Sequence, residues 1–210
     1  ICGNSGIVGE KSERLRFLEM LLMELICSHS EDDVKIFLLG EESDIRQMAW
    51  IRMIPHIQTN EKGRRIGWEK KSRRSLEEIF ERELVWRQAQ KKKEPCWVLC
   101  FLQESEENLY FMEQLEEAVQ YGIYSIFLTE DERELPKGCR TKICIEGTKG
   151  EIFSNESNEN ISFFFELPQK EILKQTAAAM ACARKKKLVE NQKLPQKITL
   201  FELIEKDGKE

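Results

Sequence analysis

The feature that most constrains the fold of this chain is an alternation of short apolar runs with amphipathic segments across its first 128 residues. Four runs have this character, at residues 5–9, 33–39, 96–102 and 123–128. The last three are almost continuously apolar, which is typical of parallel strands buried on both faces. A strand, a helix and a second strand in this order predict right-handed β-α-β units in one parallel sheet.

Amphipathic segments separate these runs. Residues 11–27 place apolar side chains at three- and four-residue spacing, at Leu15, Leu18, Leu22, Leu25 and Ile26. The capping-box spacing of Ser75 and Glu78 predicts the start of a second helix, which ends at the lysines 91–93. A third helix is expected over 105–121, with Gly122 as its cap. Residues 41–58 are less regular, and a short strand is expected at 65–68.

The pattern changes after residue 128. Three closely spaced short strands are expected at 143–146, 151–153 and 161–165, which predicts an antiparallel edge of the sheet. A last helix is expected to start near Pro168. The fold class is therefore a three-layer α/β/α, P-loop NTPase-like (RecA/FtsK-like) sheet, mostly parallel with an antiparallel edge. We expect a domain over 1–184 and a C-terminal linker over 185–210, which docks on the domain and leads to a following domain.

Composition narrows the class of protein. A chain of 210 residues can bury one sizeable core, and a formal net charge of −5 argues against a dedicated nucleic-acid binder. No stretch is apolar enough to span a membrane. The seven cysteines form no C-x-x-C pair and the two histidines lie far from them in sequence, so we expect free thiols and no metal site.

A strand, a glycine and a helix at the start of a parallel sheet form a common phosphate-binding position, because helix N-terminal amides point toward the anion. ATP binding there uses G-x-x-x-x-G-K-[ST], in which lysine reaches the terminal phosphates and the hydroxyl holds magnesium. Counted from Gly9, the positions that require Gly, Lys and Ser or Thr hold Arg14, Leu15 and Arg16. The motif is therefore absent.

Lys11 and Ser12 follow Gly9 too closely to replace the motif, and Glu10 would place a negative charge against the phosphates. We interpret Gly9, Lys11 and Ser12 as a vestigial phosphate-loop position, and we expect no cofactor in this chain.

The second requirement of such ATPases is an acidic pair after a central strand, in which Asp holds magnesium and Glu orients the attacking water. Residues 96–102 supply the strand, but Gln103 and Glu104 follow it. The magnesium carboxylate is absent, so we interpret this pair as a vestigial Walker B position. No catalytic residue is expected.

Three other segments have simpler interpretations. Residues 29–33 contain Ser, His and Asp, but neighbours in sequence do not generally form a catalytic triad, and a helix-to-strand turn is expected. Seven basic residues in 62–74, with Trp68 among them, could bind nucleic acid or lipid headgroups, but a solvated loop and helix start is preferred. Residues 107–111 (ENLYF) match a protease site by coincidence within a helix.

Several motifs together carry a family resemblance. Residues 6–9 (GIVG), 27–34 (CSHSEDDV) and 50–56 (WIRMIPH) occur in the order and spacing of "GIVG, helix, LATxHSPDDVK, strand, WxWLKWLPH". This pattern resembles the degenerate, membrane-proximal ATPase-like domain of EssC/EccC, the FtsK/SpoIIIE-type ATPases of type VII (ESX) secretion. The chain departs from it at Met53 and Ile54. Residues 135–140 (LPKGCR) resemble the family's "LP-x-x-C" turn, and residues 198–204 (ITLFELI) resemble its "VTFLELY" element.

The resemblance implies a longer protein at the cytoplasmic face of the bacterial cell membrane. Transmembrane segments would precede this fragment, and ATPase domains that use ATP and Mg would follow it. Expected partners are those ATPase domains and other type VII secretion subunits, whereas nucleic acid is not expected and the membrane is reached only through the anchor. Candidate residues for a partner surface are Trp50, Met53, Ile54, Pro55 and His56.

The leading hypothesis is a non-catalytic pseudo-ATPase domain that couples the membrane anchor to downstream motor domains for protein export. One alternative is a divergent ATP-binding and hydrolysing domain that uses Lys11, Ser12 and Glu104. Another is a DNA-binding domain, as in FtsK/SpoIIIE-type translocases, that uses residues 62–74.

Overall fold

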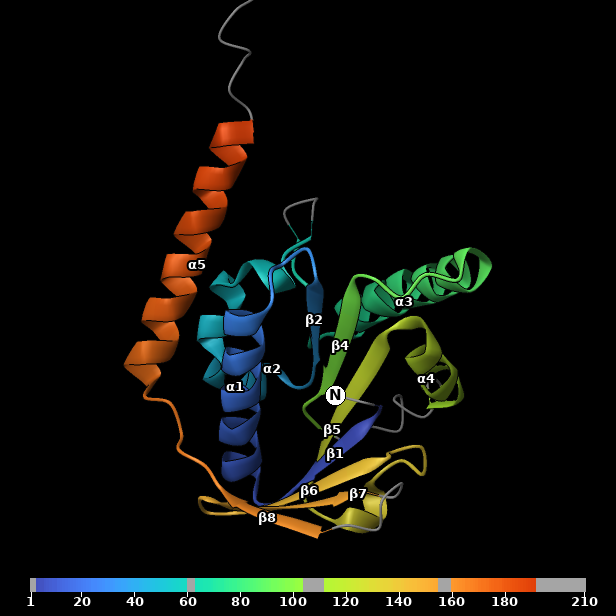
Figure 1. Ribbon diagram of the computed structural model, residues 1–210, viewed down its shortest axis with the longest axis vertical. Coiled ribbons are helices and arrows are strands. Elements are labelled where there is room, and N and C mark those ends of the chain that lie inside the picture. The colour runs from blue at the N-terminus through green and yellow to red at the C-terminus, as the bar shows by residue number, and fades with distance from the viewer. Residues whose placement is uncertain (1–2, 60–62, 104–111, 155–159, 192–210) are drawn as a thin grey trace, which may run out of the picture.

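A computed structural model describes residues 3–59, 63–103, 112–154 and 160–191 of the protein. Within these residues one sheet runs in the order β3-β2-β4-β5-β1-β6-β7-β8 (Figure 1). Its strands are β1 (Ser5–Val8), β2 (Val34–Leu39), β3 (Ile66–Gly67), β4 (Cys96–Phe101), β5 (Ile123–Thr129), β6 (Thr141–Glu146), β7 (Lys149–Ser154) and β8 (Asn160–Phe164). The strands from β3 to β6 are parallel, whereas β7 and β8 are antiparallel. The predicted mostly parallel sheet with an antiparallel edge is confirmed.

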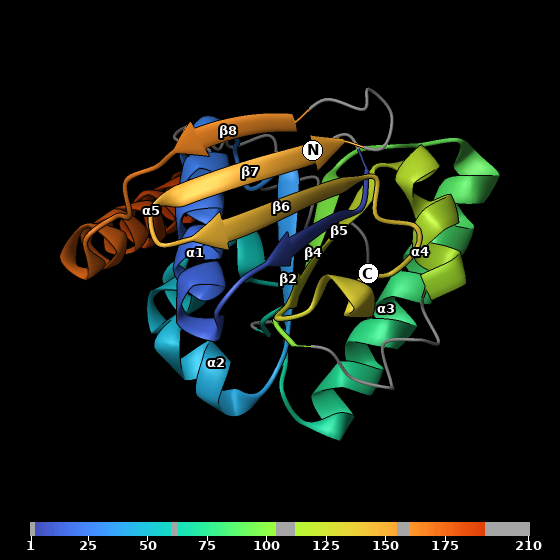
Figure 2. The ribbon, with the colours of Figure 1, turned by 90° about the horizontal axis from the view of Figure 1, so that it is seen from below.

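Helices cover both faces of the sheet, as Figure 2 shows from below. On one face lie α1 (Lys11–Ser28), α2 (Glu42–Gln47) and α5 (Lys170–Asn191), and on the other lie α3 (Lys70–Gln90) and α4 (Met112–Ala118). Short 3₁₀ helices are η1 (Ala49–Met53), η2 (Pro55–Ile57), η4 (Val119–Tyr121) and η5 (Glu132–Glu134). The predicted three-layer α/β/α arrangement is confirmed.

The alternation of side chains along the strands builds two cores. In β5, Ile126 and Leu128 belong to the core beneath α1, whereas Ile123 and Phe127 belong to the core beneath α3 and α4. A central strand with two covered faces must be apolar at nearly every position. This requirement explains the continuous apolar runs in the sequence.

The connection from β5 to β6 carries only η5 in place of a longer helix. Leu135, just after η5, packs with the core beneath α3 and α4, so this connection crosses β1 on that face. A Cβ on Gly6 of β1 would lie within 2.4 Å of the Leu135 side chain, which shows how closely the connection passes. The α1 face of β1 and β6 therefore receives no helix from this crossover.

The predicted start of α3 at Ser75 is wrong. The helix begins at Lys70, because Ser72 Oγ accepts hydrogen bonds from the backbone N–H groups of Trp68 (3.2 Å) and Glu69 (3.1 Å). These bonds satisfy the N–H groups of the N-cap residue, Glu69, and of the residue before it, so the helix starts earlier than the Ser75 pattern indicates.

Other boundaries agree more closely. The third predicted helix ends as expected at Gly122, which has a left-handed φ of 74°. Of the segment 105–121, residues 112–121 are described, as α4 and η4. Residues 104–111, including Glu104 and the ENLYF match, lie outside the described residues, as do residues 192–210. The proposed domain boundary at 184/185 falls inside α5. Within the described ranges, no helix has the length and apolar character needed to cross a membrane.

Candidate functional site

Two residues, Gly9 and Glu10, form the whole connection between β1 and α1. The Gly9 N–H donates to Thr129 O at the end of β5 (3.3 Å). A Cβ on Gly9 would lie 2.7 Å from Ile145 O, so the passage of β6 requires glycine here. The predicted strand, glycine and helix are present, and the turn between them is tight.

Lys11, the first residue of α1, points its ammonium toward α2. Lys11 Nζ lies 2.8 Å from Asp44 Oδ1, and the Asp44 side chain has no exposed surface. Burial of this carboxylate requires a cationic partner, because an unpaired buried charge is very costly. The lysine of the candidate phosphate position is thus engaged by the protein itself.

Ser12 is also engaged by a neighbour. Its Oγ donates to Glu10 Oε2 over 3.0 Å. One residue further on, Glu13 Oε1 accepts the backbone N–H of Gly147 (3.0 Å), which ties the start of α1 to the β6–β7 turn. The hydroxyl that a magnesium site would use therefore faces a carboxylate.

Arg14 occupies the position of the second glycine in the ATPase motif, and its side chain lies over the ends of the central strands. Its Nη1 donates to Gly9 O (2.8 Å) and lies 3.3 Å from Glu130 Oε1, directly after β5. The Arg14 side chain is only 7% exposed. From the sequence, Arg14 could be recognised only as a missing glycine; the distant Glu130 carries no sequence signal that links it to this turn.

Gln103 lies at the same end of the sheet, just after β4. Because β5 separates β4 from β1, the two positions predicted to be vestigial lie two strands apart. At the end of β5 between them, Thr129 Oγ1 and Glu134 Oε2 are 2.5 Å apart. The carboxyl end of the sheet thus brings the predicted positions onto one edge, while Glu104 lies outside the described residues.

The charges around the Gly9 turn are mainly negative. The carboxylates of Glu10, Glu13, Asp44 and Glu130 accompany the two cations, Lys11 and Arg14. Each cation already contacts a carboxylate. Chemically, this arrangement holds helix, strand and turn together.

The segment with the partner-surface candidates packs inside the domain. Trp50 is 4% exposed, and its Nε1 donates to Glu19 Oε1 of α1 over 2.8 Å. Burial raises the pKa of Glu19, while the hydrogen bond from Trp50 opposes this rise. Helix α5 packs against η1 and η2, which contain this segment. The tryptophan thus forms part of the contact between α1 and the 3₁₀ helices.

His56 is buried as well. Its Nε2 lies 2.8 Å from His29 O, and desolvation by burial lowers its pKa below 6.5. Ile54 and Pro55 are also buried, whereas Met53 is 36% exposed. Among the five candidate partner residues, Met53 alone presents an exposed apolar side chain, because the domain covers the others.

The basic segment 62–74 makes many contacts to its own chain. Arg64 Nε donates to Arg52 O (3.1 Å), Arg73 Nη2 donates to Gly40 O (3.0 Å), and Arg74 pairs with Glu78. Lys62 lies outside the described residues. At residues 29–33, Ser30 Oγ donates to Asp33 Oδ2 (2.6 Å), in the expected helix-to-strand turn.

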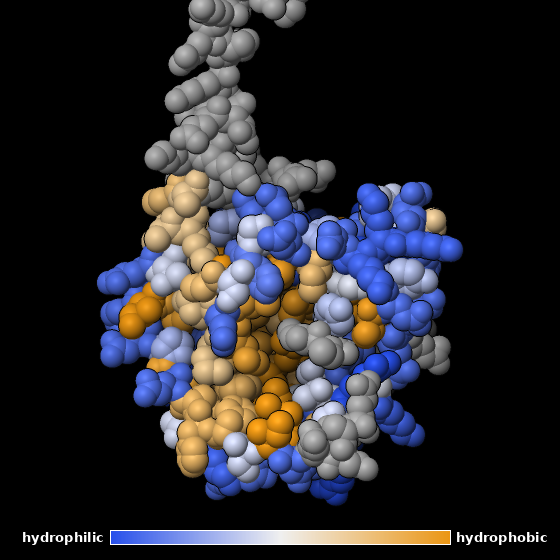
Figure 3. Space-filling view, viewed as in Figure 1, coloured by the Kyte–Doolittle hydropathy of each residue, from blue (hydrophilic) through white to orange (hydrophobic). Residues whose placement is uncertain are grey.

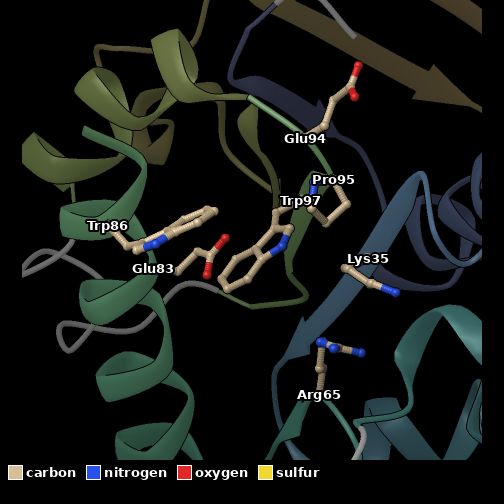
Figure 4. A pocket seen from close by; sticks show the side chains of 7 residues that line it. All are labelled: Lys35, Arg65, Glu83, Trp86, Glu94, Pro95 and Trp97. Carbon is tan, nitrogen blue, oxygen red and sulfur yellow. The ribbon is translucent and has the colours of Figure 1, made fainter. Parts of the chain in front are cut away.

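A cavity of about 440 Å³ opens at the amino ends of β2 and β4, on the α3 face (Figure 4). It is lined by Lys35, Arg65, Glu83, Trp86, Glu94, Pro95 and Trp97. Trp86 is 44% exposed, and Lys92 Nζ lies 5.3 Å from the centre of its ring. This cavity combines aromatic rings with charges of both signs and lies at the end of the sheet opposite the Gly9 turn.

Comparison with known proteins finds similar chains among EssC and EccC proteins. The chain is 25% identical over 214 residues to the ESX secretion system protein EccC of Geobacillus thermodenitrificans; the match covers 97% of this chain and 14% of that protein. No protein-family model matches.

Solved structures match the fold. EssC (ATPases 2 and 3) from Geobacillus thermodenitrificans aligns with a TM-score of 0.67 at 11% identity, covering 95% of this chain and 48% of that one. Thermomonospora curvata EccC (ATPases 2 and 3), in complex with a signal sequence peptide, aligns with a TM-score of 0.54 at 17% identity, covering 88% and 42%. The resemblance to EssC/EccC ATPase-like domains is confirmed.

Proposed function

We propose that this EssC/EccC ATPase-like domain is a non-catalytic, pseudo-ATPase part of a membrane-anchored type VII secretion ATPase. In this proposal it couples the anchor to downstream motor domains during protein export, at the cytoplasmic face of the bacterial cell membrane. ATP and Mg act in those motor domains, and this domain contacts them and other secretion subunits. The chain spans 14% of the length of the curated EccC relative, so these roles concern a longer protein.

The observation that carries the proposal is that the phosphate position is filled by the chain itself. A phosphate loop must wrap the anion with successive backbone amides. Here the connection is two residues long, and the Arg14 guanidinium lies over it, bonded to Gly9 O. These residues do not fit a triphosphate held in the manner of a phosphate loop.

Electrostatics support the same conclusion. A triphosphate at this turn would meet the carboxylates of Glu10 and Glu130, and recruitment of Lys11 would leave Asp44 buried without its cation. Removing one partner from a buried ion pair costs about 3–5 kcal/mol, and less when one partner is partly exposed, as Lys11 is at 40%. Nucleotide binding here would have to supply that free energy in addition to opening the turn.

The shape of α5 supports the coupling role. This helix has 22 residues, which corresponds to a length of about 33 Å. Leu173 and Ala177 in its first half are 1% and 0% exposed and pack in the core beneath α1. A helix fixed at its base is a stiff connection to the residues that follow it.

Calorimetric titration of the complete chain with Mg-ATP, followed by a turnover assay, tests the non-catalytic assignment. We expect no saturable heat up to about 1 mM nucleotide, and no phosphate release above buffer. Micromolar binding that Lys11→Met abolishes, with hydrolysis that Glu104→Gln removes, would instead support the divergent ATPase.

The coupling role needs the longer protein and a secretion assay. Ala178 and Ala179 are exposed on α5, and replacing both with glycine weakens the helix by about 1 kcal/mol per residue. We expect reduced export with unchanged ATP turnover by the motor domains. Glutamine at both positions is the matched control, because it preserves helix propensity. Equal export by the glycine and glutamine variants would contradict a stiff coupling through α5.

A further inference from the structure

The two outer strands of the sheet differ in how they are protected. β3 forms one edge with only two residues, Ile66 and Gly67, and both are buried. β8 forms the other edge, and four of its five residues are exposed (Figure 2). Among the residues that the structure describes, no strand pairs with the outer side of β8. Within these ranges, β8 is thus the edge at which another strand can add.

β8 lacks the features that usually protect the edge of a sheet. Natural edge strands carry charged residues, prolines or bulges that prevent pairing with another chain. The sequence of β8, NISFF, contains no charged residue and no proline, and its register with β7 is continuous. It exposes two large apolar side chains, Ile161 at 54% and Phe164 at 81%. Such an edge is a template for a further strand.

The antiparallel ladder shows which backbone groups of β8 point outward. Directly after the strand, the Phe165 N–H donates to Thr148 O (3.0 Å). Hydrogen-bonded pairs occur at every second position of an antiparallel ladder, so Phe163 and Ile161 also bond to β7. The N–H and C=O groups of the other three residues therefore point away from β7: Asn160, Ser162 and Phe164.

We propose that β8 pairs with β8 of a second copy of this chain, antiparallel and with two-fold symmetry about Ser162. In this register Ser162 lies opposite its own copy, and Asn160 lies opposite the partner's Phe164. These are the residues whose backbone groups point outward, and each such pair exchanges two hydrogen bonds. The two sheets would thus join into one, through an interface that uses the same surface of both copies.

The side chains of β8 are self-complementary in this register. Ile161 of each copy would lie opposite the partner's Phe163, and a β-branched residue opposite an aromatic one is a favourable cross-strand pair. Ile161 already ends a row that crosses the sheet through Ile143 and Ile152. Figure 3 shows apolar side chains from the centre of the view down to its lower end, where β8 lies in the same view (Figure 1). Pairing would extend this apolar row and cover the exposed Ile161.

The charges near β8 are compatible with a second copy. In register with β8, the strand β7 carries Lys149 and Glu151, whose side chains pair with each other (2.8 Å). In the symmetric register both copies of Ser162 would lie between the two Glu151 side chains. Like charges directly opposite each other, which destabilise a strand pair, are therefore avoided.

The expected dimer is weak. A stable interface buries about 800 Å² on each partner, and a strand of five residues supplies only part of that area. The pairing is therefore a contact made at high local concentration, as between copies held side by side in a larger assembly. The inference does not depend on whether the domain binds nucleotide.

Disulfide trapping in the complete chain tests the proposed register. Ser162→Cys is made in a background in which the exposed Cys27 and Cys182 are replaced by serine. Mild oxidation at about 1 mM protein should give a covalent dimer well above the level of this background. The reason is that the two Cα atoms at position 162 would lie about 5.5 Å apart, within reach of a disulfide. A yield no higher than the background would overturn the proposal.

Mixed variants test the direction of the strands. In the same background, Asn160→Cys and Phe164→Cys should each give no more covalent dimer than the background, because antiparallel pairing holds each residue far from its own copy. A mixture of the two variants should give the covalent dimer. Dimer formation by Asn160→Cys alone would indicate parallel strands and would overturn the two-fold arrangement.

Ser162→Pro gives a readout that does not depend on cysteine. Proline removes the outward N–H that the symmetric pair needs, while the hydrogen bonds to β7 remain, so the melting temperature should stay close to that of the unmodified chain. In sedimentation equilibrium, the average mass of the unmodified chain should rise above the monomer value up to about 1 mM, whereas Ser162→Pro should stay monomeric. Ser162→Thr keeps the N–H and is the matched control. Equal association of the proline and threonine variants would overturn the pairing through β8.

Discussion

The two ends of the parallel sheet are held together by different interactions. At the carboxyl end, the ion pairs Lys11–Asp44 and Arg14–Glu130 close the β1–α1 turn. At the amino end, cavities lie beside α1 and α3, and their linings combine aliphatic and aromatic side chains with charged ones such as Lys35, Glu83 and Glu94. At the carboxyl end the ion pairs fill the turn, whereas the amino end keeps open cavities.

This difference bears on what the domain binds. In open α/β sheets, ligands usually bind outside the carboxyl ends of the strands. Here the chain's own cations and carboxylates occupy that place, while accessible apolar surface lies at the opposite end. Under the proposed function, the fold is retained while the chain's own side chains fill its usual ligand site, and contacts with polypeptide replace contacts with phosphate.

The largest effect should come from Arg87, which holds the amino end of the sheet. Its side chain has no exposed surface; it donates to Tyr121 O (2.8 Å) and Pro95 O (2.6 Å) and pairs with Glu83 (2.8 Å). Arg87→Met leaves these partly buried carbonyls without their donor and Glu83 without its cation. We expect the free energy of unfolding to fall by about 3–5 kcal/mol in urea titrations.

Arg82 on the same helix is the matched control for Arg87. Arg82 is exposed, so Arg82→Met should change the free energy of unfolding by less than about 0.5 kcal/mol. Equal losses of unfolding free energy in the two variants would show that Arg87 acts only through helix propensity. The contacts of its guanidinium would then not stabilise the amino end of the sheet.

The carboxyl end should show a smaller effect. Lys11→Met leaves the fully buried Asp44 carboxylate without its cation, and we expect a loss of about 1–2 kcal/mol. The loss should stay below that of Arg87→Met, because Lys11 is 40% exposed and water screens the pair. Lys149→Met, which breaks the exposed pair with Glu151, should cost less than Lys11→Met in the same titration. If Lys11→Met is equally mild, this ion pair does not hold the turn closed.

Much of the sheet could be predicted from the sequence because its signal is local. The apolar runs that contain β2, β4 and β5 predicted buried strands, since a strand covered on both faces needs apolar residues throughout. The antiparallel edge was predicted from strands too closely spaced for crossover helices. Periodicity within a few residues was sufficient for these elements.

The contacts at the two ends could not be predicted in the same way, because they join distant residues. Trp50 was interpreted as a candidate for a partner surface, yet Glu19, 31 positions earlier, accepts its hydrogen bond inside the domain. Arg14 pairs with Glu130, and the sequence between them gives no sign of the contact. The vestigial phosphate position at Gly9, Lys11 and Ser12 stays a prediction from the sequence, whereas the contacts around it depend on tertiary packing.

A pH titration sharpens the comparison at the amino end. Burial lowers the pKa of His56 below 6.5, so the unfolded chain takes up this proton at a higher pH than the folded chain. The stability contribution is therefore complete above about pH 6.5 and is lost as the pH falls toward the folded pKa. We expect the free energy of unfolding to fall between pH 7.5 and 5.5, and the profile to be flatter for His56→Gln.

The other histidine of the chain is the control for this titration. His29 is exposed, and it bonds to His56 through its backbone carbonyl, which His29→Gln retains. The pH profile of His29→Gln should match that of the unmodified chain. If both substitutions flatten the profile equally, the pH dependence cannot be assigned to the burial of His56.

The smallest effect is expected for Ser12→Ala, which separates the two interpretations of the carboxyl end. Ser12 is exposed, and its Oγ bonds only to Glu10 among the contacts resolved for that hydroxyl. Its removal should change the free energy of unfolding by less than about 0.5 kcal/mol. In a divergent ATPase the same hydroxyl would hold magnesium, and its loss would lower the melting temperature measured with Mg-ATP. Because the Ser12 hydroxyl faces a carboxylate, we expect the melting curves of Ser12→Ala and the unmodified chain to coincide with and without Mg-ATP. A difference between their melting temperatures that appears only with Mg-ATP would instead indicate that nucleotide binds at the phosphate position. The two ends of the sheet would then not differ in the way described above.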